Sequence, residues 1–374
     1  MGIIRTLLAL VVVLQHCYPQ TPTIGGRNAV QLFYIVSGFL ISFVLVERKT
    51  YASLGSFYLN RALRLYPAYL VVAALTLILA LVAHEPQRFI QLYETAPSSA
   101  VAFLSIVNAL LIGQDWLFFF DIRHGELVYS PFVTGDSTLW HGLLAPQAWS
   151  LGVEMSFYAV APFILTQKRR WVAFLLASCA VRFYLLQQGL GNRDPWTYRF
   201  FPSELALFLL GAFSHQVVLP ACRRIAEPHR ARAAVAATLL LIALGLAYAW
   251  IPLGVGMRSA ALVGAFVLLL PLTFIFQNRY RFDAWVGNLS YPIYICHMLV
   301  IYVVASVGGR WAIDHPLAQA LVVVVASVAF GLLLESAVSN PVERLRQRIR
   351  MRAGPGRPVT PASNDSVVRP PQPT

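Results

Sequence analysis

Apolar runs close to membrane-spanning length recur along the whole chain, separated by short polar segments. A transmembrane helix needs about 20 predominantly apolar residues, and eleven segments approach that length. They cover approximately residues 3–18, 28–46, 64–83, 99–120, 147–166, 171–188, 199–219, 232–251, 258–276, 284–305 and 316–338. The pattern therefore predicts an all-α polytopic membrane protein.

The basic residues gather in short loops between apolar runs, which is typical of cytoplasmic loops. Basic clusters follow the second, fifth, seventh, ninth and last segments. If the loops after the second and fifth segments are both cytoplasmic, residues 85–146 must begin and end outside. The fourth segment, 99–120, is then re-entrant or interfacial, because it completes no crossing. This predicts about ten transmembrane helices with both termini cytoplasmic. In the alternative, the fourth segment spans the membrane, and one basic loop is then an exception to the rule that such loops are cytoplasmic.

Composition agrees with a membrane protein, because 58% of the 374 residues are hydrophobic and only 12% are charged. The net charge of +13 would suggest a nucleic-acid partner for a soluble chain. Here the basic residues lie between apolar runs, so we expect a lipid bilayer as partner and no nucleic acid. The last residues are basic and then rich in proline. We therefore divide the chain into a membrane domain, 1–345, and a disordered cytoplasmic tail, 346–374.

The first apolar segment carries Arg5 near its start and His16 near its end. Eleven residues of α-helix rise about 16 Å and make about three turns, so both side chains lie on one face. Ionisable groups inside membrane helices are expensive and usually mark a functional site. The alternative is that Arg5 is a snorkelling anchor and His16 a polar tip at the interface.

Two further motifs lie in the second segment and in the loop after it. Ser37 and Gly38 fall within FYIVSGFLI, and small residues in such a run let helices approach closely, so we expect structural or pore-lining roles for both. Arg61 and Arg64 are three residues apart in the next loop, so they point the same way on a helical turn. Two guanidinium groups suit a phosphorylated ligand; the alternative is a positive-inside anchor.

Glu154 and His297 are ionisable residues inside the fifth and tenth segments. A carboxylate in an apolar run is costly unless it is paired or functional, so Glu154 is either an acid/base group or half of a structural pair. His297 is either functional or a hydrogen-bonded packing residue. Ser150 and Tyr291, in the same two motifs, are expected to be structural or pore-lining. No metal-binding cluster of histidine and cysteine is present in the sequence, so we expect no metal.

Taken together, these motifs resemble those of the membrane acyltransferase-3 family, whose members O-acylate bacterial surface polysaccharides, lipid-linked sugars and some macrolides. Each motif is weak alone, but their order along residues 3–345 is specific. One departure is Met155, where relatives often have a second acidic residue. The resemblance rests on Arg5 with His16, on FYIVSGFLI, on Arg61, Arg64 and Pro67, on WSLGVEMSFY with Glu154, and on LSYPIYICH ending at His297.

The resemblance implies an acyl-CoA donor on the cytoplasmic side, most simply acetyl-CoA, and a hydroxyl acceptor on a glycan or glycolipid. It also implies a multi-pass protein of the bacterial inner membrane. Charge parity places the arginines at the cytoplasmic mouth, His16 and Glu154 near the outer side, and His297 in the middle or upper part. We therefore expect Arg5, Arg61 and Arg64 to bind the donor and His16, Glu154 and His297 to be catalytic.

A second hypothesis from a different class is a transporter or flippase for a glycan or an anionic solute. In that case Arg5, His16, Glu154 and His297 would line a path and no bond would be made. The motif set favours the enzyme. The chain also has no evident internal repeat, which many transporters have. Transfer of a label from acetyl-CoA distinguishes the two.

Overall fold

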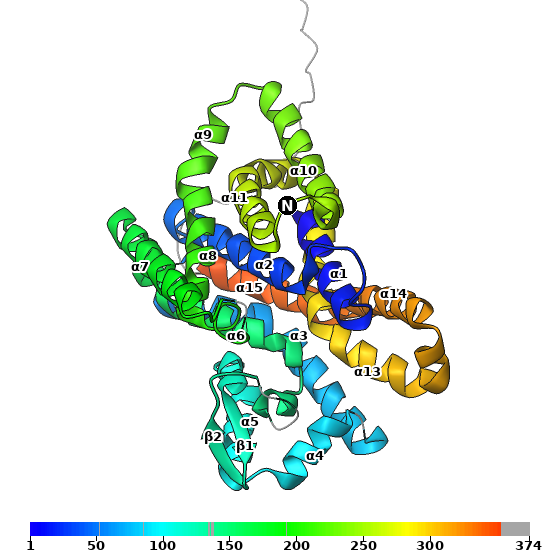
Figure 1. Cartoon of the computed structure of the whole chain (residues 1–374). Coiled ribbons are helices and arrows are strands. Elements are labelled where there is room, and N and C mark those ends of the chain that lie inside the picture. The colour runs from blue at the N-terminus through cyan, green and yellow to red at the C-terminus, as the bar shows by residue number, and fades with distance from the viewer. Residues whose placement is uncertain (52, 85, 134, 136–137, 192, 353–374) are drawn as a thin grey trace, which may run out of the picture.

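The computed structural model describes residues 1–352 apart from 52, 85, 134, 136, 137 and 192; the predicted disordered tail lies mostly outside the described residues. The described chain is mainly helical, and α1 and α2 lie near the middle of the molecule (Figure 1). The helices are α1 (Gly2–Cys17), α2 (Gly25–Ser42), α3 (Leu54–Ala83), α4 (Gln87–Thr95), α5 (Ser98–Leu110), α6 (Trp149–Ile164), α7 (Lys168–Gln187), α8 (Phe201–Phe213), α9 (Leu219–Arg223), α10 (His229–Ala247), α11 (Val255–Arg279), α12 (Arg281–Asn288), α13 (Ser290–Asp314), α14 (Pro316–Leu334) and α15 (Asn340–Arg352).

Eight helices in the described part of the chain are long and apolar enough to cross a membrane. The predicted class, an all-α membrane protein, therefore agrees with the structure. The count of ten also includes α1 and α6, which have 16 residues each. Such helices rise about 24 Å, less than the usual hydrocarbon thickness of about 30 Å. The count of ten spans and the side of each terminus stay predictions. The eight helices are Gly25–Glu47, Leu54–Ala83, Lys168–Gln187, Phe201–Arg223, His229–Trp250, Val255–Arg279, Arg281–Asp314 and Pro316–Gln347.

The fourth apolar run is not one continuous helix. Helix α5 has 13 residues and ends at Leu111, whose left-handed backbone (φ 57°) breaks the helical path. A 3-10 turn, Gln114–Phe119, follows. Since 13 residues of α-helix rise only about 20 Å, α5 is too short to cross a bilayer on its own. The expectation that this run adds no crossing is consistent with its length.

A small antiparallel hairpin follows this turn, which the sequence patterns did not predict. Strand β1 (Phe120–Arg123) pairs with β2 (Glu126–Tyr129), and Arg123 lies opposite Glu126. The connecting residues, His124 (φ 53°) and Gly125 (φ 75°), both have positive φ, as a tight two-residue hairpin turn requires. Four-residue strands are too short to give a clear alternating pattern in the sequence.

Arg61 and Arg64 lie on a helix and not in a loop, which corrects the sequence interpretation. Helix α3 begins at Leu54, ten residues before the apolar run that predicted it. Ser53 and Ser56 form a capping box, because each side chain accepts a hydrogen bond from the other residue's backbone N–H. Because of this cap the helix begins before the apolar run. The backbone of both arginines is therefore held in α3.

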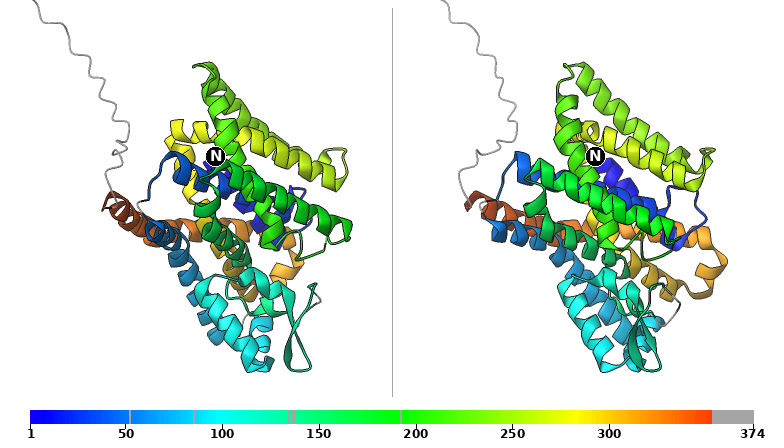
Figure 2. Two further views of the ribbon diagram at one scale, coloured as in Figure 1. Left: turned by 90° about the vertical axis from the view of Figure 1, so that its left-hand side faces the viewer. Right: turned by 60° about the vertical axis from the view of Figure 1, so that its left-hand side comes forward.

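The basic connections gather at one end of the bundle, as the charge pattern requires. Glu47, after α2, forms a salt bridge with Arg223 at the end of α9. Gln216 donates to both the Ser42 hydroxyl and the Leu165 carbonyl, which brings the α6–α7 connection to the same place. In the right-hand view of Figure 2, α15 lies at the left of the bundle and the α13–α14 connection lies at its right. We call the side of the bundle where α15 lies the basic end.

Helix α15 is part of the packed fold, although the sequence division at 345/346 passes through it. Arg346 is buried, and its Nη2 donates to the Asn60 Oδ1 of α3 over 2.9 Å. This contact joins the end of the described chain to the start of α3. The division of the chain at that position stays a prediction, and the described structure continues seven residues beyond it, through Arg352.

Two close contacts fix α1 and α2 in the bundle. Asp283, at the start of α12, accepts hydrogen bonds from the backbone N–H groups of Gly2 (2.6 Å) and Ile3 (2.8 Å). It therefore caps α1 and fixes the height of Arg5. A Cβ at Gly38 would overlap the Phe208 carbonyl of α8. Gly38 thus serves helix packing and does not line a pore.

We expect a cysteine placed at Glu126, on the hairpin, to react with an impermeant thiol reagent applied to intact spheroplasts. The charge rule places the loops after the second and fifth apolar segments in the cytoplasm, so residues 85–146, which include the hairpin, begin and end outside. A cysteine at Arg169, on the basic end, should react only after the membrane is opened. The unsubstituted protein gives the background from the native cysteines. The reverse pattern would contradict the predicted orientation.

Candidate functional site

A cavity of about 200 Å³ lies among α1, α2, α3, α6 and α13, and we call it the arginine cavity. Most of the site residues predicted from sequence line it. The lining comes from the first three helices together with α6 and α13, which are distant in sequence, so only the folded bundle brings these side chains together. The predicted residues in its wall are Arg5, Ser37, Arg61, Arg64, Ser150, Glu154 and Tyr291.

The three arginines of this cavity differ in their surroundings. The guanidinium groups of Arg5 and Arg64 are half-buried, and neither has a hydrogen bond or an ion pair within the described chain. Arg61 is buried, and its Nη2 donates to the Tyr51 hydroxyl (2.9 Å) and to Asn60 Oδ1 (3.0 Å). An unpaired cation in an apolar setting is unfavourable unless an anion accompanies it. Arg5 and Arg64 therefore form a site ready for an anionic group.

Glu154 lies in the arginine cavity and not beside His16, which corrects the predicted grouping. Its Oε1 accepts hydrogen bonds from the Ser37 hydroxyl (2.5 Å) and the Tyr158 hydroxyl (2.6 Å). Tyr158 follows Glu154 by one helical turn, so the sequence WSLGVEMSFY already contained this partner. Helix order alone placed Glu154 near His16, whereas the packing of α6 puts it in the same cavity as the arginines. Glu154 thus provides a negative charge opposite the arginines.

A second cavity of about 380 Å³ contains His16, and we call it the histidine cavity. Its wall includes Gln15 and His16 of α1, Arg27 of α2, Gln147 before α6 and Arg199 before α8. His16 is exposed there, whereas His297 is fully buried next to it. The two imidazole rings lie 5.0 Å apart between centroids. The structure therefore brings together the two predicted catalytic histidines.

Both histidines hold one ring nitrogen against a backbone carbonyl. His16 Nδ1 lies 2.8 Å from the Val12 carbonyl, and His297 Nδ1 lies 2.7 Å from the Tyr294 carbonyl. A carbonyl only accepts, so each neutral ring carries its proton on Nδ1. This leaves the Nε2 lone pair of each ring available to accept a proton. The Nε2 of His297 has no partner in the described part of the chain.

Aromatic and arginine side chains form the rest of this wall. The Arg199 guanidinium stacks 4.1 Å from the Trp149 ring centroid and pairs with Asp194 at 2.8 Å. Burial raises the pKa of Tyr198 to about 12, so its hydroxyl stays neutral. These residues lie in a predicted outer loop or at a helix start. No spacing in the sequence indicated that they belong to the site.

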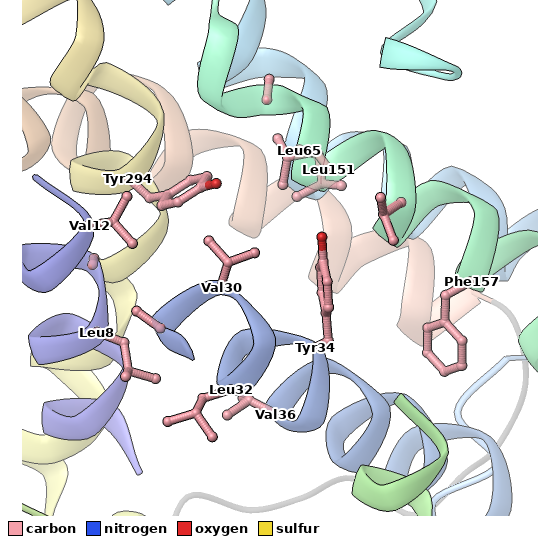
Figure 3. Close-up of a cluster of buried hydrophobic side chains, with 14 of the residues drawn as sticks. Leu8, Val12, Val30, Leu32, Tyr34, Val36, Leu65, Leu151, Phe157 and Tyr294 are labelled. Atoms are coloured by element: carbon pink, nitrogen blue, oxygen red, sulfur yellow. The ribbon is translucent and has the colours of Figure 1, made fainter. Parts of the chain in front are cut away.

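The two cavities meet at Val30 and Tyr294, which line both of them. Figure 3 shows Val30 of α2 between Tyr294 of α13 and Tyr34 of α2. The Tyr294 hydroxyl donates to the Gln147 carbonyl (3.0 Å) and lies 2.6 Å from the Ser150 hydroxyl. Ser150, predicted as structural or pore-lining, therefore fixes Tyr294 at this junction. The sequence did not single out Val30 or Tyr294.

Comparison with known proteins gives one family across most of the chain. Residues 1–336 match the acyltransferase-3 family, described as an acyltransferase domain. The chain is 25% identical to nodulation protein 10 of Rhizobium leguminosarum bv. viciae, over 85% of this chain and 82% of that protein. It is 24% identical to the acyltransferase MdmB of Streptomyces mycarofaciens, over 90% and 85% respectively.

A further similarity covers part of the chain. It is 27% identical to the peptidoglycan O-acetyltransferase OatA of Listeria monocytogenes, over 40% of this chain and 21% of that protein. No solved structure matches the fold.

Proposed function

We propose that this protein, which belongs to the acyltransferase-3 family, moves an acyl group from acyl-CoA to a hydroxyl group across the membrane. That it is an acyltransferase follows from the family; the donor, the acceptor and the direction are the proposal. The donor is a cytoplasmic coenzyme A thioester, most simply acetyl-CoA. The acceptor is a hydroxyl of a cell-surface or lipid-linked glycan, and the enzyme lies in the bacterial inner membrane.

The observation that carries this proposal is the pair of adjoining cavities. One contains two unpaired guanidinium groups, and the other contains His16 beside His297. Arginine binds phosphate oxygens through two parallel hydrogen bonds, so the phosphates of coenzyme A suit the arginine cavity. The thioester then points through the junction toward His16. The basic end of the bundle is the cytoplasmic side in this arrangement.

The transfer step uses His16 as a general base. The acceptor oxygen attacks the thioester carbonyl carbon while His16 Nε2 takes the hydroxyl proton. The new C–O bond forms, the C–S bond breaks, and the coenzyme A sulfur takes the proton from His16. The Val12 carbonyl keeps the Nδ1 proton in place, so Nε2 is the site of exchange. His297 supports the His16 ring from the buried side.

The histidine cavity supports a sugar as the acceptor. Trp149 and Tyr198 provide aromatic surface, and the buried Gln147 Oε1 and Arg199 Nη1 have no partner among the described residues. A ligand with several hydroxyl groups can donate to the first and accept from the second. The similar protein OatA is a peptidoglycan O-acetyltransferase, and peptidoglycan is a polymer that contains sugars. This agrees with a glycan acceptor.

We expect purified protein in lipid vesicles to transfer label from acetyl-CoA to a glycan acceptor or, without one, to hydrolyse the donor slowly. Surface glycans of a deletion strain, compared with the parent by mass spectrometry, should lack the mass of one acyl group. The matched control is the His16→Ala protein at equal expression. Labelled glycan or solute crossing vesicles with no bond made would contradict the proposal and favour a transporter.

A further inference from the structure

Two side chains form the layer at which the arginine cavity and the histidine cavity adjoin. Among the residues lining the two cavities, only Val30 and Tyr294 are common to both. Both side chains are buried, and they come from different helices, α2 and α13. A group that moves from the arginines to His16 along this shared wall therefore moves past these two side chains.

The two sides of this layer differ in how firmly they are held. Tyr294 contacts the start of α6 through its hydroxyl, at the Gln147 carbonyl and the Ser150 hydroxyl. Its ring also packs edge-on against Phe33, with centroids 6.0 Å apart. Val30 has only apolar atoms and one preferred χ1 in a helix. Tyr294 is thus a fixed wall, and the width of the passage depends on the branched side chain of Val30.

We infer that Val30 and Tyr294 form a gate that selects the acyl group by its width, admitting unbranched acyl groups and excluding branched ones. This inference rests on the proposed function, because the acyl end of the thioester must cross the layer before His16 can act on it. An unbranched acyl chain is no wider than the cysteamine end of the pantetheine arm, the part that follows it into the layer. A branch next to the carbonyl widens the group at the point where Val30 and Tyr294 face each other. The donor class is therefore linear acyl-CoA.

Two thioesters with the same atoms test this directly, butyryl-CoA and isobutyryl-CoA. For each, kcat/KM is measured relative to acetyl-CoA with the purified protein in vesicles. Val30→Ala removes two methyl groups from the layer and should raise the isobutyryl ratio about tenfold or more, the effect of such a change in a hydrophobic pocket. The butyryl ratio should rise much less. Val30→Leu should lower the butyryl ratio.

Val72→Ala is the matched control. Val72 lies on α3, is 1% exposed and thus buried like Val30, and lines neither cavity. It should leave all ratios as in the unsubstituted protein. The gate is overturned if Val30→Ala and Val72→Ala change the ratios alike, or if acetyl transfer persists in Val30→Ala with unchanged ratios. If Val30→Ala does not fold, an unchanged butyryl ratio in Val30→Leu overturns it.

Failure of the proposed function gives a different result. In that case the unsubstituted protein transfers no acyl group from any of these thioesters. If the protein is active but its kcat/KM ratios do not change with the size of residue 30, only the gate is overturned and the proposed function stands.

Discussion

Replacing His16 with alanine is expected to reduce acyl transfer by about 10²–10⁴-fold, the usual effect of losing a general base. The His16 side chain is exposed in the histidine cavity, and its Nδ1 is held by the Val12 carbonyl. Its Nε2 is therefore oriented to take the acceptor proton. The loss should appear in kcat, with little change in donor KM, because the arginines that bind the donor lie in the other cavity. Transfer assays with labelled acetyl-CoA measure both quantities.

His315→Ala provides a matched control for this substitution. His315 also holds its Nδ1 against the carbonyl one helical turn before it, that of Trp311 (3.2 Å), but it is exposed and lines neither cavity. It should transfer acyl groups like the unsubstituted protein. Full activity in His16→Ala at equal expression would show that His16 is not the base. A rise in donor KM alone would indicate that His16 acts in binding.

The sequence predicted those parts of the fold that depend on long apolar runs and on charge. The gathering of basic connections at one end follows from the positive-inside rule alone. The hairpin and the early start of α3 were not predicted, because a two-residue turn and a serine capping box depend on single residues. The fourth apolar run was assigned as one segment because hydropathy does not register the left-handed residue Leu111.

The candidate site was predicted in part, for a related reason. Arg5, Glu154 and His297 are conspicuous because ionisable residues inside apolar runs are rare. Arg61 and Arg64 were identified by their three-residue spacing in a predicted loop. Their grouping depends on helix rotation, which apolar spacing does not fix when a helix is buried on most sides. Glu154 was therefore assigned to the wrong neighbours: helix order placed it beside His16, whereas it lies in the cavity of Arg5 and Arg64.

Val30 and Tyr294, the residues at the junction of the two cavities, could not be predicted from the sequence. Val30 and Tyr294 are an ordinary valine and tyrosine in apolar helices, so nothing in their type marks them. They matter only because α2 and α13 place them where two cavities adjoin. Gly38 is the opposite case, since its type indicated close packing and the structure places it against α8.

The double variant Arg5→Ala/Arg64→Ala is expected to lose donor binding. Each charge-assisted hydrogen bond to phosphate contributes about 1.5–3 kcal/mol. Two such losses should raise the donor KM about 100-fold or more, since 1.4 kcal/mol corresponds to tenfold. Arg5 and Arg64 are half-buried, and their guanidinium groups have no hydrogen bond or ion pair in the described chain, so their donors are available to the phosphates.

Thermal melting with and without coenzyme A measures donor binding independently of turnover. A ligand that binds only the folded state raises the melting temperature, so coenzyme A should stabilise the unsubstituted protein and have little effect on the double variant. Arg169→Ala/Arg224→Ala is the matched control, because it removes the same charge from two exposed positions near the basic end that line neither cavity. It should keep the response to coenzyme A. If the double variant keeps both the response to coenzyme A and its donor KM, the arginine cavity does not bind the donor. The proposed path of the acyl group from the arginines to the histidines would then be wrong.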